Sequence, residues 1–199
     1  FLEFRKIDTG INNSFVTIEP IGLVLGIMPW NFPFWQVFRF VVPTIIAGNG
    51  AILKHASNVQ GCANAIECVF LDAGFPVNLF RNLSIPGSRV NKVIEHSGIA
   101  GVTLTGSTPA GKAVAAKAGE CLKKTVLELG GSDPYVILDD ADLDQAVAAC
   151  TAGRMLNAGQ SCIAAKRLIV TIKNQSKFIS SLRQSIELKI MGDPMDDVD

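Results

Sequence analysis

Short runs of apolar, β-branched residues alternate along this chain with longer segments of helical periodicity, and this alternation restricts the fold more than any other feature. The short runs predict strands at 15–19, 21–28, 51–55, 77–85, 101–105, 125–129, 135–138 and 166–172. The longer segments predict helices at 33–48, 58–74, 88–96, 109–122, 142–156 and 175–189. Strands that alternate with such helices form βαβ units, and almost wholly apolar strands are typical of sheets covered on both faces. We therefore expect an α/β fold with a mainly parallel sheet and helices on both faces.

Ligands of such sheets bind beyond the carboxyl ends of the strands. Four segments directly follow predicted strands and are the first places to look for site residues. They are "PWNFP" at 29–33, "KHAS" at 54–57, "TGSTPAG" at 105–111 and "ELGG" at 128–131.

The charges of the chain argue against a nucleic-acid partner. Eighteen basic residues balance eighteen acidic ones, and no basic stripe is visible. Hydrophobic residues make up 48% of the sequence, which is enough to form a core. The expected partner is a small molecule or another copy of the chain.

Cysteine usage predicts reduced thiols in a cytoplasmic protein with no metal site. The number of cysteines is odd, no CxxC spacing occurs, and only two histidines are present. The cysteines are Cys62, Cys68, Cys121, Cys150 and Cys162. The most apolar stretch, 21–53, is interrupted by Pro29, Arg39 and Pro43, so no membrane span is expected.

The segment "TGSTPAGKA" resembles a phosphate-binding loop, because Gly106, Gly111 and Lys112 have the G-x-x-x-x-G-K spacing. Two features argue against a nucleoside triphosphatase. Ala113 replaces the serine or threonine that holds magnesium, and Pro109 lacks a backbone donor. Two interpretations stay open: a helix N-terminus that binds an anion, or an ordinary strand-to-helix turn.

Two polar side chains near strand ends have both a catalytic and a structural interpretation. Asn31 lies between two prolines, where its amide is placed either to stabilise an oxyanion or to make a local turn bond. Glu128 ends an apolar strand, where it is either a general base or a solvent-facing carboxylate.

Cys162 differs from the other cysteines because it lies between a helix and a strand. A thiol at such an edge can be exposed and tuned by the helix terminus. The other four lie within helical periods, and Cys150 is on an apolar helix face, so we interpret them as core or neutral residues. Locally, Cys162 is either a nucleophile or a small hydrophobic residue.

Taken together, "PWNFP", "ILKHAS", "TLTGS", "LELGG" and "GQSC" resemble the aldehyde dehydrogenase family in their order and separation. The resemblance is greatest to the bacterial branch that oxidises succinate semialdehyde with NAD(P)+. It implies a Rossmann-like cofactor domain without the G-x-G-x-x-G fingerprint, which this sequence also lacks. On this basis residues 1–127 are part of a cofactor domain, and residues 128–199 begin a catalytic domain.

The resemblance also implies roles for individual residues. Cys162 matches the nucleophile, Asn31 matches an oxyanion ligand, and Glu128 matches the base that activates water to hydrolyse the thioester. Arg39 matches an arginine that pairs with the distal carboxylate of the substrate, although a surface or structural arginine is the alternative.

The resemblance implies a bound NADP or NAD. Ser57 stands where members that prefer NAD often carry glutamate, so NADP should at least be tolerated. The positions that match cofactor contacts are Met28, Pro29, Trp30, Lys54, Ser57, Gly106, Ser107, Ala110 and Leu129.

Some features depart from the family pattern. Ala164 replaces the second cysteine that serves some relatives as a redox switch, so no such switch is expected. Family members are longer and commonly homo-oligomeric. We therefore expect a fragment of a homo-oligomeric enzyme, with little turnover by the 199 residues alone. The alternative is a non-catalytic fragment or nucleotide-binding module that keeps the fold.

Overall fold

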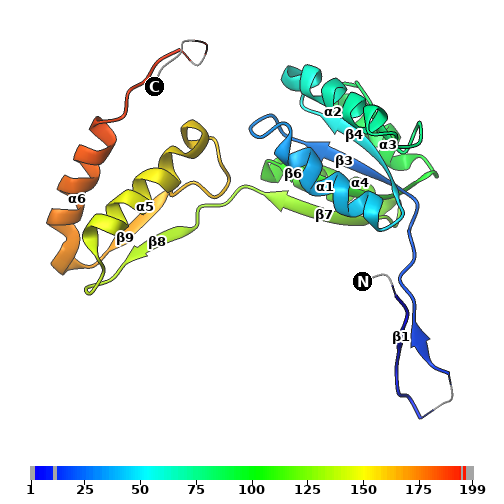
Figure 1. Ribbon diagram of the computed structural model, residues 1–199, viewed down its shortest axis with the longest axis horizontal. Helices are drawn as coiled ribbons and strands as arrows, with labels where there is room; N and C mark the ends of the chain where they lie inside the picture. Colours follow the sequence, from blue (N-terminus) through cyan, green and yellow to red (C-terminus); the bar gives the residue numbers. More distant parts are fainter. Residues whose placement is uncertain (1–2, 11–12, 194, 196–199) are drawn as a thin grey trace. The chain divides into compact units, whose positions relative to one another are not determined.

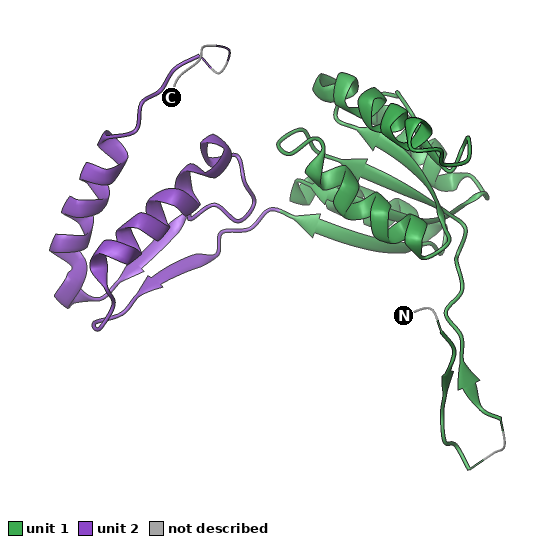
Figure 2. Cartoon of the chain, viewed as in Figure 1, with its two compact units in different colours: residues 1–129 green, residues 130–199 purple. Residues whose placement is uncertain are grey.

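The chain forms two compact units, Phe1–Leu129 and Gly130–Asp199 (Figure 2). The computed structural model describes residues 3–10, 13–193 and 195. The division falls two residues after the expected boundary because the last strand of the first unit continues to Leu129, which pairs with Gly106. Glu128 and Leu129 therefore belong to the first unit.

The first unit is built on a five-stranded sheet in which every neighbouring pair is parallel. The strand order is β5-β4-β3-β6-β7 (Figure 1). The strands are β3 (Leu23–Met28), β4 (Gly50–His55), β5 (Phe80–Asn82), β6 (Ile99–Gly106) and β7 (Lys124–Leu129). The helices are α1 (Trp35–Ile46), α2 (Gln60–Asp72), α3 (Val90–Glu95) and α4 (Thr108–Glu120). This arrangement confirms the expected α/β fold with a mainly parallel sheet.

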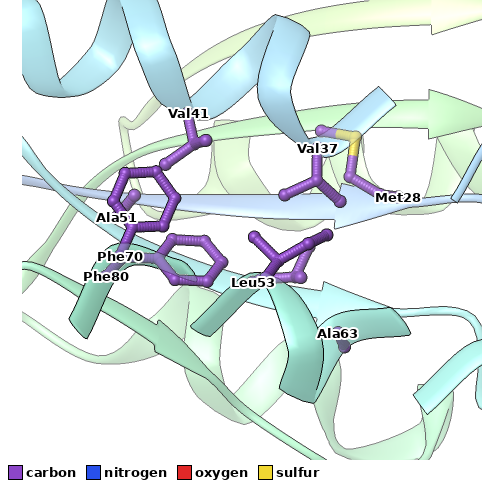
Figure 3. Close-up of a cluster of buried hydrophobic side chains, with 9 residues drawn as sticks. Met28, Val37, Val41, Ala51, Leu53, Ala63, Phe70 and Phe80 are labelled. Carbon is purple, nitrogen blue, oxygen red and sulfur yellow. The ribbon is translucent and has the colours of Figure 1, made fainter. Parts of the chain in front are cut away.

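Helices cover both faces of this sheet, and each face has its own core. On one face, α1 and α2 bury Val37 and Phe70 against Leu53 of β4 (Figure 3). On the other face, α3 and α4 bury Ile94 and Val114 against β3 and β6. Because successive side chains of a strand point to opposite faces, β3 and β4 supply residues to both cores.

The chain order creates a switch point between β3 and β6. From β3 the chain moves outward through β4 to β5, then returns to the other side of β3 to form β6 and β7. The connections from β3 and β6 therefore leave in opposite directions at their carboxyl ends. A crevice forms at such a point, and ligands of open α/β sheets bind there.

The second unit pairs two parallel strands, β8 (Pro134–Ile137) and β9 (Arg167–Val170), with α5 (Leu143–Met155) and α6 (Ile172–Glu187). Its core includes Ile137, Val147, Cys150 and Phe178. Helix α5 begins at Leu143 because Asp142 Oδ1 caps it, accepting bonds from two backbone amides 3.0 and 3.1 Å away.

The shorter elements differ most from the sequence-based expectations. The strand expected at 15–19 is only β2 (Phe15–Val16), which pairs antiparallel with β1 (Arg5–Lys6) outside the main sheet. The strand expected at 77–85 shortens to β5, because Pro76 and Pro86 flank an edge strand that pairs with β4 alone. Short 3-10 turns are η1 (Ser57–Val59), η2 (Gly87–Arg89) and η3 (Leu156–Gly159).

Two kinds of feature are absent from the described residues. No helix in that part of the chain has the length and apolar content to cross a bilayer. No group of three or more His, Cys, Asp or Glu side chains within it is arranged to hold a metal ion.

Candidate functional site

The carboxyl ends of four strands meet at one edge of the first sheet. Met28 at the end of β3 lies opposite His55 of β4, and Gly106 of β6 lies opposite Leu129 of β7. The segments that carry Asn31, Lys54, Ser107 and Glu128 therefore reach the same edge, on both sides of the switch point. The structure thus brings together the site residues predicted for the first unit.

Strand alternation separates these residues between the two faces of the sheet. Along β4, Leu53 and His55 are buried on the side of α1 and α2, whereas the half-buried Lys54 points to the side of α3 and α4. Along β7, Glu128 lies on the side of α1, and Leu129 packs on the side of α4. Lys54 and Leu129 therefore share one face, and Glu128 is on the other.

The turn from β6 into α4 has the features of an anion site. Ser107 is the N-cap of α4, and its Oγ accepts a bond from the Ala110 amide, 3.4 Å away. The helix begins so close to β7 that a Cβ at Gly111 would lie only 2.5 Å from Leu129 Cδ2. Glycine at that position lets the helix N-terminus approach the sheet edge.

These residues fit a dinucleotide. The Lys54 ammonium on the α4 side of the sheet and the exposed Ser57 hydroxyl after it supply donors to a sugar or phosphate. The N-terminus of α4 adds the positive end of a helix dipole, which favours a pyrophosphate. The half-exposed indole of Trp30 adds apolar surface at the end of β3. The donor set therefore matches the chemistry of NAD and NADP.

The face toward α1 carries an ion pair at the same edge. Arg39 Nη2 of α1 lies 3.1 Å from Glu128 Oε1, and both side chains are about half exposed. The pair borders a cavity of about 400 Å³ between α1 and strands β3, β6 and β7. Gln36, one helical turn before Arg39, lines the same cavity, and its buried Oε1 has no hydrogen-bond partner within the described residues.

Cys162 belongs to the second unit and lies on an exposed turn between η3 and β9. The turn is preceded by three residues with positive φ, Asn157, Ala158 and Gly159. Left-handed backbone at Ala158 costs about 1–2 kcal/mol. At Gly159, a Cβ would lie 3.2 Å from the carbonyl oxygen of Arg154, so a larger residue would be crowded as well as strained.

Neighbouring residues hold the Cys162 turn in place. Ser161 and Ala164 are buried on either side of it, and the Ala164 amide donates to the Ser161 carbonyl over 3.2 Å. Lys166 Nζ bonds to the carbonyl oxygens of Gly131 and Cys162 at 2.5 and 3.4 Å. The Cys162 side chain therefore projects from an anchored turn, and strained backbone of this kind is common at functional sites.

The other four cysteines divide by exposure. Cys150 is in the core of the second unit, and burial raises the pKa of its thiol, which disfavours the thiolate. Cys62 and Cys121 are half-buried, whereas Cys68 is exposed on α2. Cys68 was expected to be a core or neutral residue; its exposure excludes the core interpretation, because it lies on the outer face of α2 while Ala63, Ile66 and Phe70 face the sheet.

The sequence model of the aldehyde dehydrogenase family matches residues 3–199, which is almost the whole chain. The chain belongs to the aldehyde dehydrogenase family. The resemblance inferred from the five motifs is therefore confirmed at the level of the family.

Two relatives within this family are both named as succinate-semialdehyde dehydrogenases. A protein of Escherichia coli named succinate semialdehyde dehydrogenase, NAD(P)+, is 51% identical over 191 residues, covering 95% of this chain and 41% of the relative. A protein of Deinococcus radiodurans named succinate-semialdehyde dehydrogenase, NADP(+), is 45% identical over 196 residues, covering 98% of this chain and 41% of the relative. The chain therefore spans less than half the length of these aldehyde dehydrogenases.

A solved structure extends the comparison to the fold. The crystal structure of succinic semialdehyde dehydrogenase from Streptococcus pyogenes, in complex with NADP+, is similar with a TM-score of 0.95 and 39% sequence identity. The match covers 98% of this chain and 43% of that chain.

Two residues at the sheet edge of this aldehyde dehydrogenase chain, Gln36 and His55, were not predicted from the sequence. Gln36 precedes Arg39 by one helical turn, so the i, i+3 spacing was available as a signal once Arg39 had been singled out. His55 directly follows Lys54 and carried no such signal, because its contacts are with backbone atoms 22 and 27 residues earlier.

Proposed function

We propose that the complete protein oxidises succinate semialdehyde to succinate with NADP+ or NAD+. The observation that carries the substrate assignment is the position of the Arg39 guanidinium. It pairs with the Glu128 carboxylate at the sheet edge that also carries Asn31. Within this proposal, the first unit is the cofactor-binding part and the second unit begins the catalytic domain.

In the proposed reaction, the Cys162 thiolate attacks the aldehyde carbon and forms a C–S bond. The carbonyl π electrons move to oxygen, and the Asn31 amide and the Cys162 backbone N–H stabilise the resulting oxyanion. Bound NAD(P)+ supplies a two-electron acceptor for hydride, so the carbon is oxidised to a thioester. Glu128 then removes a proton from water, which attacks the thioester, breaks the C–S bond and regenerates the thiolate.

Lys54, Ser57 and the N-terminus of α4 would hold the dinucleotide. The proposal assigns Lys54 to the adenosine ribose, and Gly106, Ser107 and Ala110 to the pyrophosphate. Met28, Pro29, Trp30 and Leu129 would form the adjoining wall. Serine at position 57 donates a hydrogen bond to a 2′-phosphate without the repulsion of a carboxylate, which favours acceptance of NADP.

We further propose that the complete protein is a homo-oligomer in the cytoplasm. Five free cysteines support a reducing compartment. The β1–β2 hairpin presents Phe4 and Phe15 to solvent, 72% and 59% exposed, and apolar surface of this kind is common at contacts between subunits.

The test of this function is a panel of aldehydes measured on the complete protein with both cofactors. We expect succinate semialdehyde to have the highest kcat/KM of the panel, with turnover supported by NADP+. Higher kcat/KM for an uncharged aldehyde of similar length would reject the substrate assignment. Cofactor binding without oxidation of any aldehyde would instead support the non-catalytic nucleotide-binding alternative.

The ion pair makes a sharper prediction for Arg39→Gln. An exposed pair contributes only about 0–1 kcal/mol, so a substrate carboxylate can displace Glu128 from Arg39 at little cost. Loss of charge-assisted bonds to the substrate should raise KM for succinate semialdehyde about 10- to 100-fold. KM for an uncharged aldehyde should stay unchanged, because that substrate has no carboxylate for Arg39 to bind.

A matched control is Arg81→Gln, since Arg81 of the outer strand β5 is similarly exposed and forms an ion pair with Glu67 of α2. We expect this variant to keep wild-type KM values for both aldehydes. Equal changes in KM for charged and uncharged aldehydes in Arg39→Gln would assign Arg39 a structural role instead.

A further inference from the structure

A buried histidine lies directly beneath the loop that carries Asn31. His55 is the last residue of β4 and is fully inaccessible to solvent. Its Nε2 lies 2.9 Å from the carbonyl oxygen of Pro33, and its Nδ1 lies 3.2 Å from that of Met28. One imidazole ring therefore contacts both ends of the segment that contains Asn31.

The neighbouring atoms determine where the proton of the ring must be. A carbonyl oxygen only accepts, so the short contact to Pro33 requires a proton on Nε2. Nδ1 lies within hydrogen-bond distance of two groups, the Met28 carbonyl oxygen at 3.2 Å and the Ala56 amide at 3.0 Å. The same amide also donates to the Met28 carbonyl over 3.0 Å. Both ring nitrogens thus have polar neighbours within hydrogen-bond distance, although the side chain is completely buried.

Two residues of the loop cannot donate a backbone hydrogen bond. Pro29 and Pro33 lack backbone N–H groups, so neither can anchor the loop by donating a bond. The bond from His55 of the adjacent strand instead anchors the loop through an acceptor, the Pro33 carbonyl. A misplacement of about 1 Å in a catalytic group can reduce the rate about 100-fold, so this anchor bears directly on an oxyanion ligand.

His55 links this loop to β4, the same strand that carries Lys54. The two residues are consecutive in β4, and their side chains point to opposite faces of the sheet. The end of one strand therefore carries the lysine assigned to the cofactor and the support for Asn31. Supporting side chains that are locked by packing and hydrogen bonds are what keep a site within catalytic tolerance.

We infer that His55 is a positioning residue that holds the Asn31 loop in the geometry required for oxyanion stabilisation. The inference rests on the proposed function, because it takes the role of Asn31 from it. His55 itself touches neither the substrate nor the cofactor in this scheme. Its effect is transmitted through the Pro33 carbonyl.

The test is a double-mutant cycle on the complete protein, read as the rate of the first NADPH formed in a single turnover. His55→Leu removes the Nε2 donor, and we expect it to slow this step about 10- to 100-fold. In an Asn31→Ala background, the same substitution should have almost no further effect, because groups that act through one another are not additive. The dissociation constant of NADP+ should remain within about threefold of wild type in the Asn31→Ala protein, in which the loop keeps its bond to His55.

His55→Gln provides the conservative comparison, since its amide can replace Nε2 as a donor to Pro33. We expect it to recover most of the lost rate; if His55→Leu does not fold, the cycle is run with His55→Asn, whose shorter amide does not reach. Full multiplication of the His55 and Asn31 effects would overturn the positioning role, as would an unchanged rate in a folded His55→Leu protein. An unchanged rate in Asn31→Ala alone would instead reject the oxyanion role in the proposed function.

Discussion

Replacing Cys162 with serine is expected to reduce aldehyde oxidation by the complete protein about 10⁴-fold or more. Serine keeps the size and exposure of the side chain on the turn before β9. Serine has no sulfur to form the C–S bond on which the proposed route depends. Its hydroxyl is also scarcely ionised near neutral pH, so it is a poor replacement nucleophile. Steady-state NADPH production and mass spectrometry of the trapped thioester would both measure this loss.

Exposure alone does not distinguish Cys162 from other thiols, because Cys68 is also exposed. Cys68→Ser is therefore the matched control, and we expect it to retain wild-type turnover. With the Cys68→Ser protein, one equivalent of an alkylating reagent should abolish activity by labelling Cys162. Loss of activity in Cys68→Ser, or full activity in Cys162→Ser, would contradict the assignment of the nucleophile.

The shared sheet edge of the candidate site could be predicted because parallel strands place their carboxyl ends at one edge. The apolar runs before Asn31, Lys54 and Glu128 predicted those strands, so the shared edge followed from the fold class. Strand alternation also explains why Lys54 and His55 serve opposite faces. These are local patterns that a single sequence carries.

Contacts between distant segments could not be predicted in this way. The Arg39–Glu128 pair depends on how α1 lies across β3 and β4 relative to β7, which no periodicity specifies. The contact of His55 with Pro33 depends on the path of an irregular loop between two prolines. The β1–β2 hairpin is formed by strands of two residues each, too short for an alternating pattern to appear.

Replacing Glu128 with glutamine is expected to separate the two halves of the reaction. In the proposed mechanism Glu128 acts only after hydride has left, so the variant should still form the thioester and release a burst of NADPH of about one equivalent per active site. Hydrolysis should then slow about 10²- to 10⁴-fold, because the amide cannot accept a proton from water. Stopped-flow absorbance at the NADPH band measures the burst and the following steady rate in one experiment.

The ion pair with Arg39 makes a control necessary, because Glu128→Gln removes a charge as well as a base. Glu95 has similar exposure and forms an ion pair with Lys117 over 3.1 Å, away from the site. Glu95→Gln should therefore show wild-type burst and steady-state rates. A Glu128→Gln protein without a burst would mean that Glu128 is needed before hydride transfer, where its pairing with Arg39 shapes substrate binding. A burst followed by slow turnover is the outcome that only a base for thioester hydrolysis predicts.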